Sequence, residues 1–90
     1  MKIRVTKQDI ELGRPNKGYF CPISLATSRE LPNYRIYVGR LCITLMKEEE
    51  IKEIIQLPNE ATTFIERFDE ECEDVKVQPF EFEICPTLKQ

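Results

Sequence analysis

Hydrophobic and polar residues alternate over residues 2–6, the period of a half-buried β-strand with Ile3 and Val5 facing inward. The same alternation returns in three later segments, residues 34–38, 41–45 and 80–84. Gly39 separates the two middle segments, and a single glycine fits either a tight turn or a bulge in one longer strand. The pattern predicts half-buried strands in these segments and leaves the structure at Gly39 open.

Helical spacing is clearest over residues 59–70. Hydrophobic residues recur there at i, i+3, i+4 and i+7, the spacing of one buried helical face. These residues are Ala61, Phe64, Ile65 and Phe68. Asn59 stands where a capping side chain is expected. The segment predicts the main helix of the fold, with Phe64 and Phe68 in the core.

Two shorter helices are predicted, near residues 7–12 and 22–30. Thr6 and Asp9 have the spacing of a capping box, in which each side chain accepts a hydrogen bond from the other residue's amide. Gly13 is placed to leave the first helix in the left-handed conformation. Pro22 suits the first position of the second helix, because its fixed φ and missing N–H are tolerated there.

Residues 47–57 are compatible with two structures. Ile51, Ile54 and Ile55 have helical spacing and follow three glutamates, which favour a helix N-terminus. Ile55 and Leu57 instead fit the alternation of a strand. The pattern alone slightly favours a helix.

The composition is typical of one small globular domain. Hydrophobic residues make up 41% and charged residues 32% of the 90 residues, unlike a disordered chain. No hydrophobic run approaches the roughly 18 residues of a membrane span, and the charged start of the chain lacks a signal-peptide core. We therefore expect a single cytoplasmic α+β domain over residues 1–90, without membrane contact. Its sheet is expected to be mixed or antiparallel, with about four to five strands.

The chain has four cysteines and no histidine. Cys21, Cys42, Cys72 and Cys85 form no C-x-x-C pair, so we expect reduced structural thiols and neither a metal site nor a cofactor. Without histidine the chain lacks the usual general base near neutral pH and the Ser–His and Cys–His nucleophile pairs. Cys21 stands at a helix start, which can lower a thiol pKa, but it has no histidine partner. We therefore expect that the protein is not an enzyme.

Charge is distributed unevenly along the sequence. Residues 1–40 carry eight Lys/Arg against three Asp/Glu, and residues 41–90 carry five against thirteen, for a net charge of −3. Either the two parts attract each other within the fold, or one face is made for a charged partner. In the second case the acidic part would imitate a nucleic-acid backbone in the basic groove of a host enzyme. Pairing within the fold and solvated acidic residues are the simpler interpretation.

The first candidate site is the glycine-rich loop before the helix predicted at residues 22–30. Its residues are Arg14, Lys17, Gly18, Tyr19 and Cys21. The free amides and positive dipole end of a helix start can receive a phosphate or carboxylate. Arg14 and Lys17 would close over this anion, and Tyr19 or Phe20 would stack on a base. The loop lacks the G-K-[ST] of a P-loop, and the simpler alternative is a turn with two solvated cations.

The second candidate site is a sheet face on which Arg35 and Tyr37 would lie beside Glu81 and Glu83. Opposite charges on neighbouring strands form ion pairs, whereas Tyr and Arg are also favoured anchors in protein interfaces. The face is therefore either a set of cross-strand ion pairs, the simpler interpretation, or a partner surface.

Three short motifs occur in a fixed order along the chain. They are V-T-x-x-D-I at residues 5–10, C-P-I-x-L-A at residues 21–26 and P-F-x-F at residues 79–82. Together they resemble a group of small uncharacterised proteins of tailed phages, prophages and some bacteria. The resemblance implies no activity, cofactor or catalytic residue. It does imply that residues 47–57 contain the second arm of a hairpin, which favours a strand for residues 54–57.

From the sequence we expect a non-enzymatic binding protein, of the type of a phage or prophage accessory factor that engages a host protein and inhibits it. The alternative is a small-ligand binder that captures an anionic metabolite or nucleotide at the glycine-rich loop. Direct binding of nucleic acid is not expected, because the net charge is negative and no basic–aromatic stripe is present. The sequence leaves the oligomeric state open.

Overall fold

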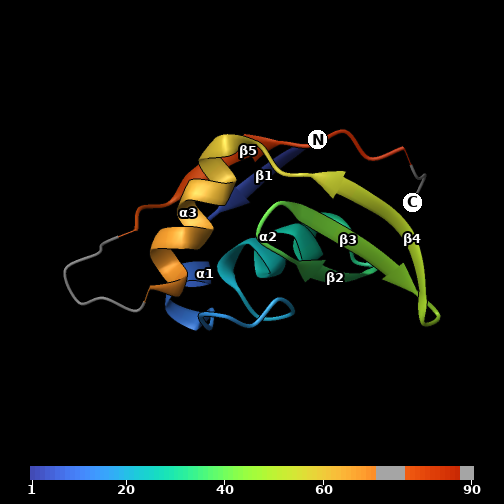
Figure 1. Cartoon of the computed structure of the whole chain (residues 1–90), viewed down its shortest axis with the longest axis horizontal. Helices are drawn as coiled ribbons and strands as arrows, with labels where there is room; N and C mark the ends of the chain where they lie inside the picture. Colours follow the sequence, from blue (N-terminus) through green and yellow to red (C-terminus); the bar gives the residue numbers. More distant parts are fainter. Residues whose placement is uncertain (71–76, 88–90) are drawn as a thin grey trace.

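The computed structural model describes residues 1–70 and 77–87, which form three helices and five strands (Figure 1). The helices are α1 (Lys7–Leu12), α2 (Pro22–Glu30) and α3 (Asn59–Asp69). The strands are β1 (Lys2–Val5), β2 (Arg35–Val38), β3 (Cys42–Lys47), β4 (Glu50–Gln56) and β5 (Phe80–Glu83). The α+β class predicted from the sequence is confirmed, with all three helices in the predicted places. Within the described ranges, no helix has the length and apolar character needed to cross a membrane.

The strands are antiparallel and are divided between two sheets. β1, near the start of the chain, pairs with β5, near its end, so these distant segments lie side by side (Figure 1). β2, β3 and β4 form the second sheet in that order, through two successive hairpins. The sequence pattern did not predict this division, because alternation defines the buried face of a strand and not the strand with which it pairs.

Residues 50–56 form β4, so the strand implied by the resemblance is confirmed and the helix favoured by the pattern alone is wrong. Glu48 and Glu49 start no helix; they connect β3 to β4 with φ values of 55° and 66°. A two-residue hairpin turn with positive φ at both central positions matches the twist of the flanking strands. The break at Gly39 is also a turn, in which its amide donates to the Cys42 carbonyl oxygen at 2.9 Å.

The capping box at the start of α1 is confirmed. The Thr6 hydroxyl accepts a hydrogen bond from the Asp9 amide at 3.1 Å, and the Asp9 carboxylate accepts one from the Thr6 amide at 2.9 Å. The left-handed conformation predicted for Gly13 is wrong, since its φ is −70°. A Cβ atom at Gly13 would lie 2.6 Å from Cδ of Pro22, so this position needs glycine for close packing.

Helix α3 packs an aromatic group against β5. The Phe64 ring centroid lies 4.8 Å from that of Phe80 and 6.0 Å from that of Phe68. Phe64 is buried, as predicted, whereas Phe68 is only partly buried against the core. The cap predicted at Asn59 is wrong, because Asn59 is already helical and the N-cap is Pro58, whose ring offers no hydrogen-bond acceptor.

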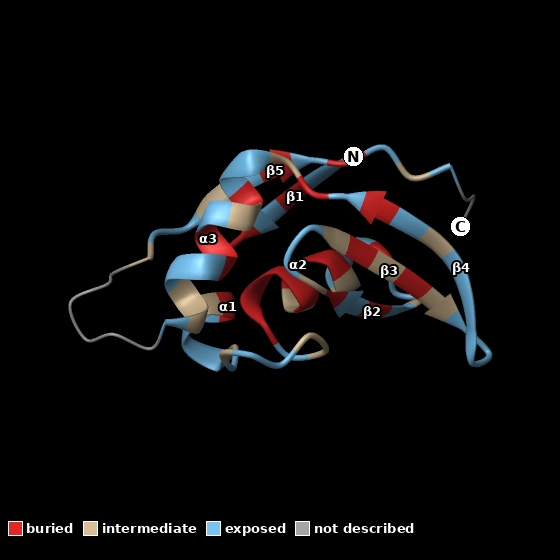
Figure 2. Ribbon diagram, in the orientation of Figure 1, coloured by how far each residue is buried: buried red, intermediate tan, exposed pale blue. Residues whose placement is uncertain are grey.

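The core lies between the two sheets and the helices, where buried residues of several elements face one another (Figure 2). Ile3 and Val5 of β1 are fully buried, as predicted. Ile36 and Ile43 contribute from β2 and β3, and each alternates with more exposed neighbours along its strand. One face of the second sheet therefore packs on the core, and its other face points to solvent.

Candidate functional site

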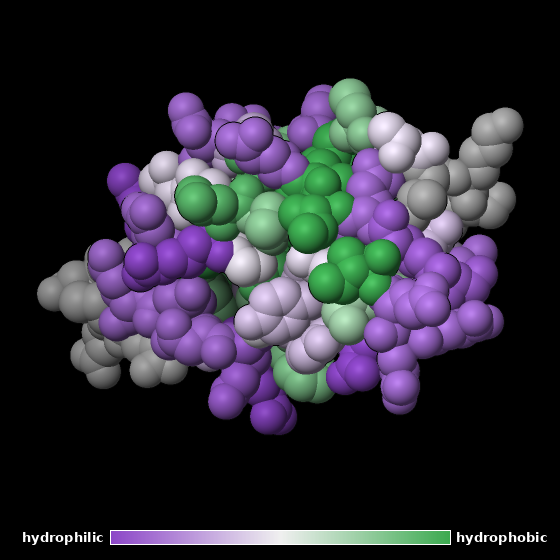
Figure 3. Space-filling model, turned by 45° about the vertical axis from the view of Figure 1, so that its right-hand side comes forward, coloured by the Kyte–Doolittle hydropathy of each residue, from purple (hydrophilic) through white to green (hydrophobic). Residues whose placement is uncertain are grey.

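The solvent-facing side of the β2–β3–β4 sheet carries exposed hydrophobic side chains, and we call it the outer face. Directly paired residues on antiparallel strands point to the same side of a sheet. Two cross-strand rows on the outer face are therefore defined by the register: Arg35–Met46–Ile51, the turn-side row, and Tyr37–Thr44–Ile54, the loop-side row. Ile51 and Ile54 are 61% and 60% exposed, and Tyr37 is 42% exposed. Figure 3 shows hydrophobic side chains gathered in the middle of the molecule, with hydrophilic residues around them.

A bulge in β4 brings both isoleucines to the outer face. The register of β3 with β4 shifts next to Met46, and Lys52 is the additional residue in β4. Residues three positions apart in a regular strand point to opposite faces. Because of the extra residue, Ile51 and Ile54 instead lie on the same face, and this is the spacing that resembles a helix in the sequence.

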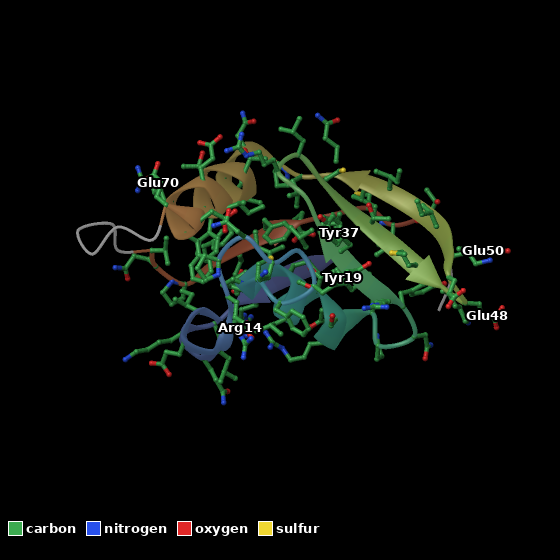
Figure 4. All side chains as sticks on the ribbon, turned by 60° about the horizontal axis from the view of Figure 1, so that its bottom comes forward. Arg14, Tyr19, Tyr37, Glu48, Glu50 and Glu70 are labelled. Atoms are coloured by element: carbon green, nitrogen blue, oxygen red, sulfur yellow. The ribbon has the colours of Figure 1, made fainter. Side chains whose placement is uncertain are left out.

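Tyr19, from the loop before α2, covers the β2 side of the outer face. Its ring meets that of Tyr37 edge-on at 4.9 Å between centroids, and the guanidinium carbon of Arg35 lies 4.2 Å from its centroid. Its hydroxyl donates to Sδ of Met46 at 3.7 Å. A Cβ atom at Gly18 would lie 2.5 Å from the Tyr37 ring, so glycine is needed for this packing. Tyr19 from the first predicted site and Arg35 and Tyr37 from the second thus form one surface. Figure 4 shows Tyr19 next to Tyr37.

Opposite charges lie at the two ends of the outer face. Arg40 stands in the β2–β3 loop and lines a hollow together with Lys17; neither cation forms an ion pair with any described residue. At the other end, Glu48 and Glu49 form no ion pair within residues 1–70 and 77–87, and Lys52 of the same hairpin pairs with Glu50 at 2.9 Å and also feels the charge of Glu48. Figure 4 shows Glu48 at the tip of the β3–β4 hairpin, far from Tyr37. The face therefore has a basic end and an acidic end.

The anion site predicted in the glycine-rich loop is only partly assembled. Lys17, Gly18 and Cys21 line a hollow of about 200 Å³, together with Arg40, which the sequence did not indicate. Arg14 does not line this hollow, and Figure 4 shows it apart from the two labelled tyrosines. Tyr19 lies on the outer face instead. Two cations from different loops therefore line the hollow in place of the predicted pair, and Asp69 of α3 lines it with them.

The start of α2 is buried and capped, so it offers little access to an anion. Cys21 is the N-cap, and its Sγ accepts a hydrogen bond from the Ser24 amide at 3.4 Å. Cys21 and Ile23 are 7% and 0% exposed. Burial raises the pKa of the Cys21 thiol above its ordinary value, and the hydrogen bond from Ser24 opposes burial only in part. The lowered pKa considered for a thiol at a helix start is therefore wrong for Cys21.

The second predicted site is divided between the two sheets. Arg35 and Tyr37 lie in β2, whereas Glu81 and Glu83 lie in β5 of the other sheet. Glu81 forms an ion pair with Arg4 at 2.9 Å, and Glu83 forms one with the N-terminal amine at 3.3 Å. These contacts join the basic and acidic parts of the sequence, as expected for pairing within the fold. Residues 71–76 of the acidic stretch, including Cys72, lie outside the described residues.

In comparisons with protein-family models, curated proteins and solved structures, no match to this chain was found.

Proposed function

We propose that the protein is a non-enzymatic protein-binding domain whose contact surface is the outer face of the β2–β3–β4 sheet. The observation that carries this proposal is the grouping of exposed hydrophobic residues. Seven large hydrophobic side chains are exposed among the described residues, and four of them belong to this sheet or its β2–β3 loop. These four are Tyr37, Leu41, Ile51 and Ile54. Single exposed hydrophobic residues are normal, but a group on one face marks an interaction surface.

The residue types of the outer face also favour protein binding. Tyr and Arg are the residues most often found as energetic anchors in interfaces. Tyr19 is held by Tyr37, Arg35 and Met46 before any partner arrives. Such preorganisation reduces the side-chain entropy lost on binding. The cation–π contact also keeps the Arg35 guanidinium positioned above an aromatic ring.

The finer part of the proposal is that the chain is a cytoplasmic accessory factor of a phage or prophage, which engages a host protein and inhibits it. This part is supported by the resemblance of the three motifs at residues 5–10, 21–26 and 79–82. A small domain with no predicted catalytic pair acts on a host most simply by occupying a protein surface.

The test uses a matched pair of variants in the tagged full chain. A protein captured from bacterial lysate is purified and then titrated against the wild type, Ile54→Lys and Leu12→Lys. Ile54 and Leu12 are 60% and 65% exposed, so both variants should keep the far-ultraviolet circular dichroism of the wild type. We expect Ile54→Lys to weaken binding at least about tenfold, and Leu12→Lys, on α1, to leave it unchanged. Equal binding by the wild type and Ile54→Lys would contradict the proposal.

A second candidate function is the capture of a small anion at the hollow lined by Lys17 and Arg40. It is supported by the two cations, which form no ion pair with described residues and outnumber the one acidic residue, Asp69, on a hollow of about 200 Å³. Titration with inorganic phosphate and with ATP, followed by amide chemical shifts, tests it. Saturable shifts near Lys17 and Arg40 that disappear in Arg40→Ala support this function, and the absence of shifts at about 10 mM ligand, well above typical metabolite affinities, excludes it.

A further inference from the structure

We propose that the outer face is self-complementary and that a second copy of this chain binds to it, face to face and with the strands running in opposite directions. The inference rests on the proposed function, since it uses the same face and names a partner for it. A host partner would then bind in competition with the second copy.

The charges at the two ends of the outer face select the orientation. A two-fold symmetric interface uses the same patch on both copies, so that a contact from one residue to another is made twice. If the two-fold axis ran along the strands, Arg40 would meet Arg40 and Glu48 would meet Glu48. If the axis lies across the strands, the ends are exchanged, and Arg40 of each copy meets Glu48 of the other. Like charges in contact are strongly disfavoured, so the second orientation is the one that these residues permit.

The two cross-strand rows fit the same orientation. An axis between them places the loop-side row of one copy on the turn-side row of the other. Ile54 then packs on Ile51 of the other copy, which covers the two most exposed isoleucines of the sheet. At β2, Tyr19 covers Tyr37 and Arg35 within each copy, so Tyr19 is the aromatic side chain that this side of the face presents to the other copy. Ile54 and Ile51 thus cover each other, Thr44 meets Met46, and the cation at one end meets the carboxylate at the other.

The size of the face predicts a weak dimer. β3 has six residues, so at a rise of roughly 3.4 Å per residue it is about 20 Å long. Three strands roughly 4.8 Å apart form a face smaller than the roughly 800 Å² per partner of a standard interface. We expect a dissociation constant in the micromolar range, at which monomer and dimer coexist at ordinary protein concentrations.

The first measurement is sedimentation velocity of the full chain from about 5 to 500 µM, a range that brackets a micromolar dissociation constant. We expect a monomer–dimer equilibrium for the wild type and for Leu12→Lys. Ile54→Lys should raise the dissociation constant at least about tenfold, because two lysines would face Ile51 across the interface. Circular dichroism of all three proteins separates loss of the dimer from loss of the fold.

The second measurement tests the orientation by exchanging charges. Arg40→Glu alone and Glu48→Lys alone place like charges opposite each other twice in each homodimer. We expect each to weaken the dimer about three- to tenfold at low salt. An equimolar mixture of the two variants can form a heterodimer in which both end contacts join opposite charges, so the mixture should dimerise as the wild type does. Lys7→Glu, an exposed charge reversal on α1, is the control and should change nothing.

The outcomes separate this inference from the proposed function. A chain that stays monomeric at about 500 µM, far above the expected constant, overturns the inference, and so does a dimer that Ile54→Lys leaves intact. A mixture of Arg40→Glu and Glu48→Lys that dimerises no better than either variant overturns it too. If the chain is monomeric but Ile54→Lys loses a captured partner, the inference fails and the proposed function stands. If the dimer depends on Ile54 but a captured partner does not, the inference stands and the proposal of a heterologous partner on this face fails.

Discussion

Arg29 donates two hydrogen bonds to the carboxylate of Asp9, at 2.6 and 2.7 Å, and one to the backbone oxygen of Arg4 at 3.0 Å. The Asp9 side chain is 5% exposed, whereas that of Arg29 is 50% exposed. A buried carboxylate is therefore held by a cation that reaches it from the surface. The contact ties α2 to the capping box of α1 and to the strand β1. The spacing of Thr6 and Asp9 in the sequence predicts the capping role of Asp9, but nothing in the sequence indicates that Arg29 is its cation.

Replacing Arg29 by leucine should destabilise the fold by about 2 to 3 kcal/mol, since the Asp9 carboxylate would remain buried with its charge uncompensated. We place the value below that of a fully buried pair because half of the Arg29 side chain is in water. Urea unfolding of the wild type and Arg29→Leu measures the difference. Arg14→Leu is the matched control, because Arg14 is exposed and forms no ion pair with described residues, and it should stay within about 0.5 kcal/mol of the wild type.

The same contact predicts how stability depends on pH. Burial alone would raise the pKa of Asp9, but hydrogen bonds from Arg29 and Thr6 and the charge of Arg29 outweigh burial, so this pKa lies below its ordinary value. The contact therefore stabilises the fold above the unfolded pKa of about 3.9, and the stabilisation is lost as pH falls through the lower folded pKa. In Arg29→Leu, protonation of Asp9 removes its uncompensated charge. The difference in free energy of unfolding between the wild type and Arg29→Leu should therefore become smaller from pH 7 toward pH 3. If this difference does not change with pH, the charge of Asp9 is not the cause of the destabilisation.

Gly18 and Gly39 should respond differently to alanine. A Cβ atom at Gly18 would lie 2.5 Å from the Tyr37 ring, whereas the nearest atom to one at Gly39 is the Cys42 backbone oxygen at 3.7 Å. We expect Gly18→Ala to displace Tyr37 and to cost about 1 to 3 kcal/mol, as overpacking does. Gly39→Ala should change the free energy of unfolding by less than about 0.5 kcal/mol. Thermal melts compare the two, and equal melting temperatures would contradict the packing of Tyr37 on Gly18.

Local signals in the sequence were sufficient for the helices and for the buried faces of β1, β2, β3 and β5, but not for β4. The capping box at Thr6 and Asp9 depends on residues three positions apart, and the face of α3 on residues within two turns. Strand pairing depends on residues far apart, such as Ile3 with Phe82. The hydrophobic pattern carries no information about which distant strands pair, and it therefore did not predict two sheets.

The outer face could not be predicted for a related reason. Arg35 and Tyr37 were candidates for a partner surface, but their neighbours were expected to be Glu81 and Glu83. The bulge at Lys52 gives Ile51 and Ile54 the spacing of one helical face. The pattern therefore did not indicate that both isoleucines lie on the exposed face of a strand. The sequence also did not indicate the positive φ of Glu48 and Glu49, because glutamate is not typical of that conformation.

Truncation of Phe64 tests the aromatic packing between α3 and β5. Phe64 is 7% exposed and its ring contacts those of Phe68 and Phe80, so Phe64→Ala should cost about 3 to 5 kcal/mol through lost burial and the cavity left behind. Phe20→Ala removes the same atoms from a ring that is 55% exposed and should stay within about 0.5 kcal/mol. Chemical unfolding measures both. If Phe64→Ala melts within a degree or two of the wild type, α3 does not anchor the core.

The thiols of Cys21 and Cys85 should react at very different rates. Cys85 is exposed, whereas Cys21 is a buried N-cap whose thiol pKa is raised by burial. Only the thiolate reacts, so labelling of Cys21 requires both deprotonation and local opening of the α2 start. We expect Cys21 to react at least about 100-fold more slowly than Cys85 with iodoacetamide at pH 7.5, as measured for each cysteine by peptide mass spectrometry. Addition of urea below the unfolding transition should accelerate Cys21 and leave Cys85 unchanged. If Cys21 instead reacts as fast as Cys85 in the native protein, the start of α2 is open to solvent. The conclusion that it cannot receive an anion or present a reactive thiol would then be wrong.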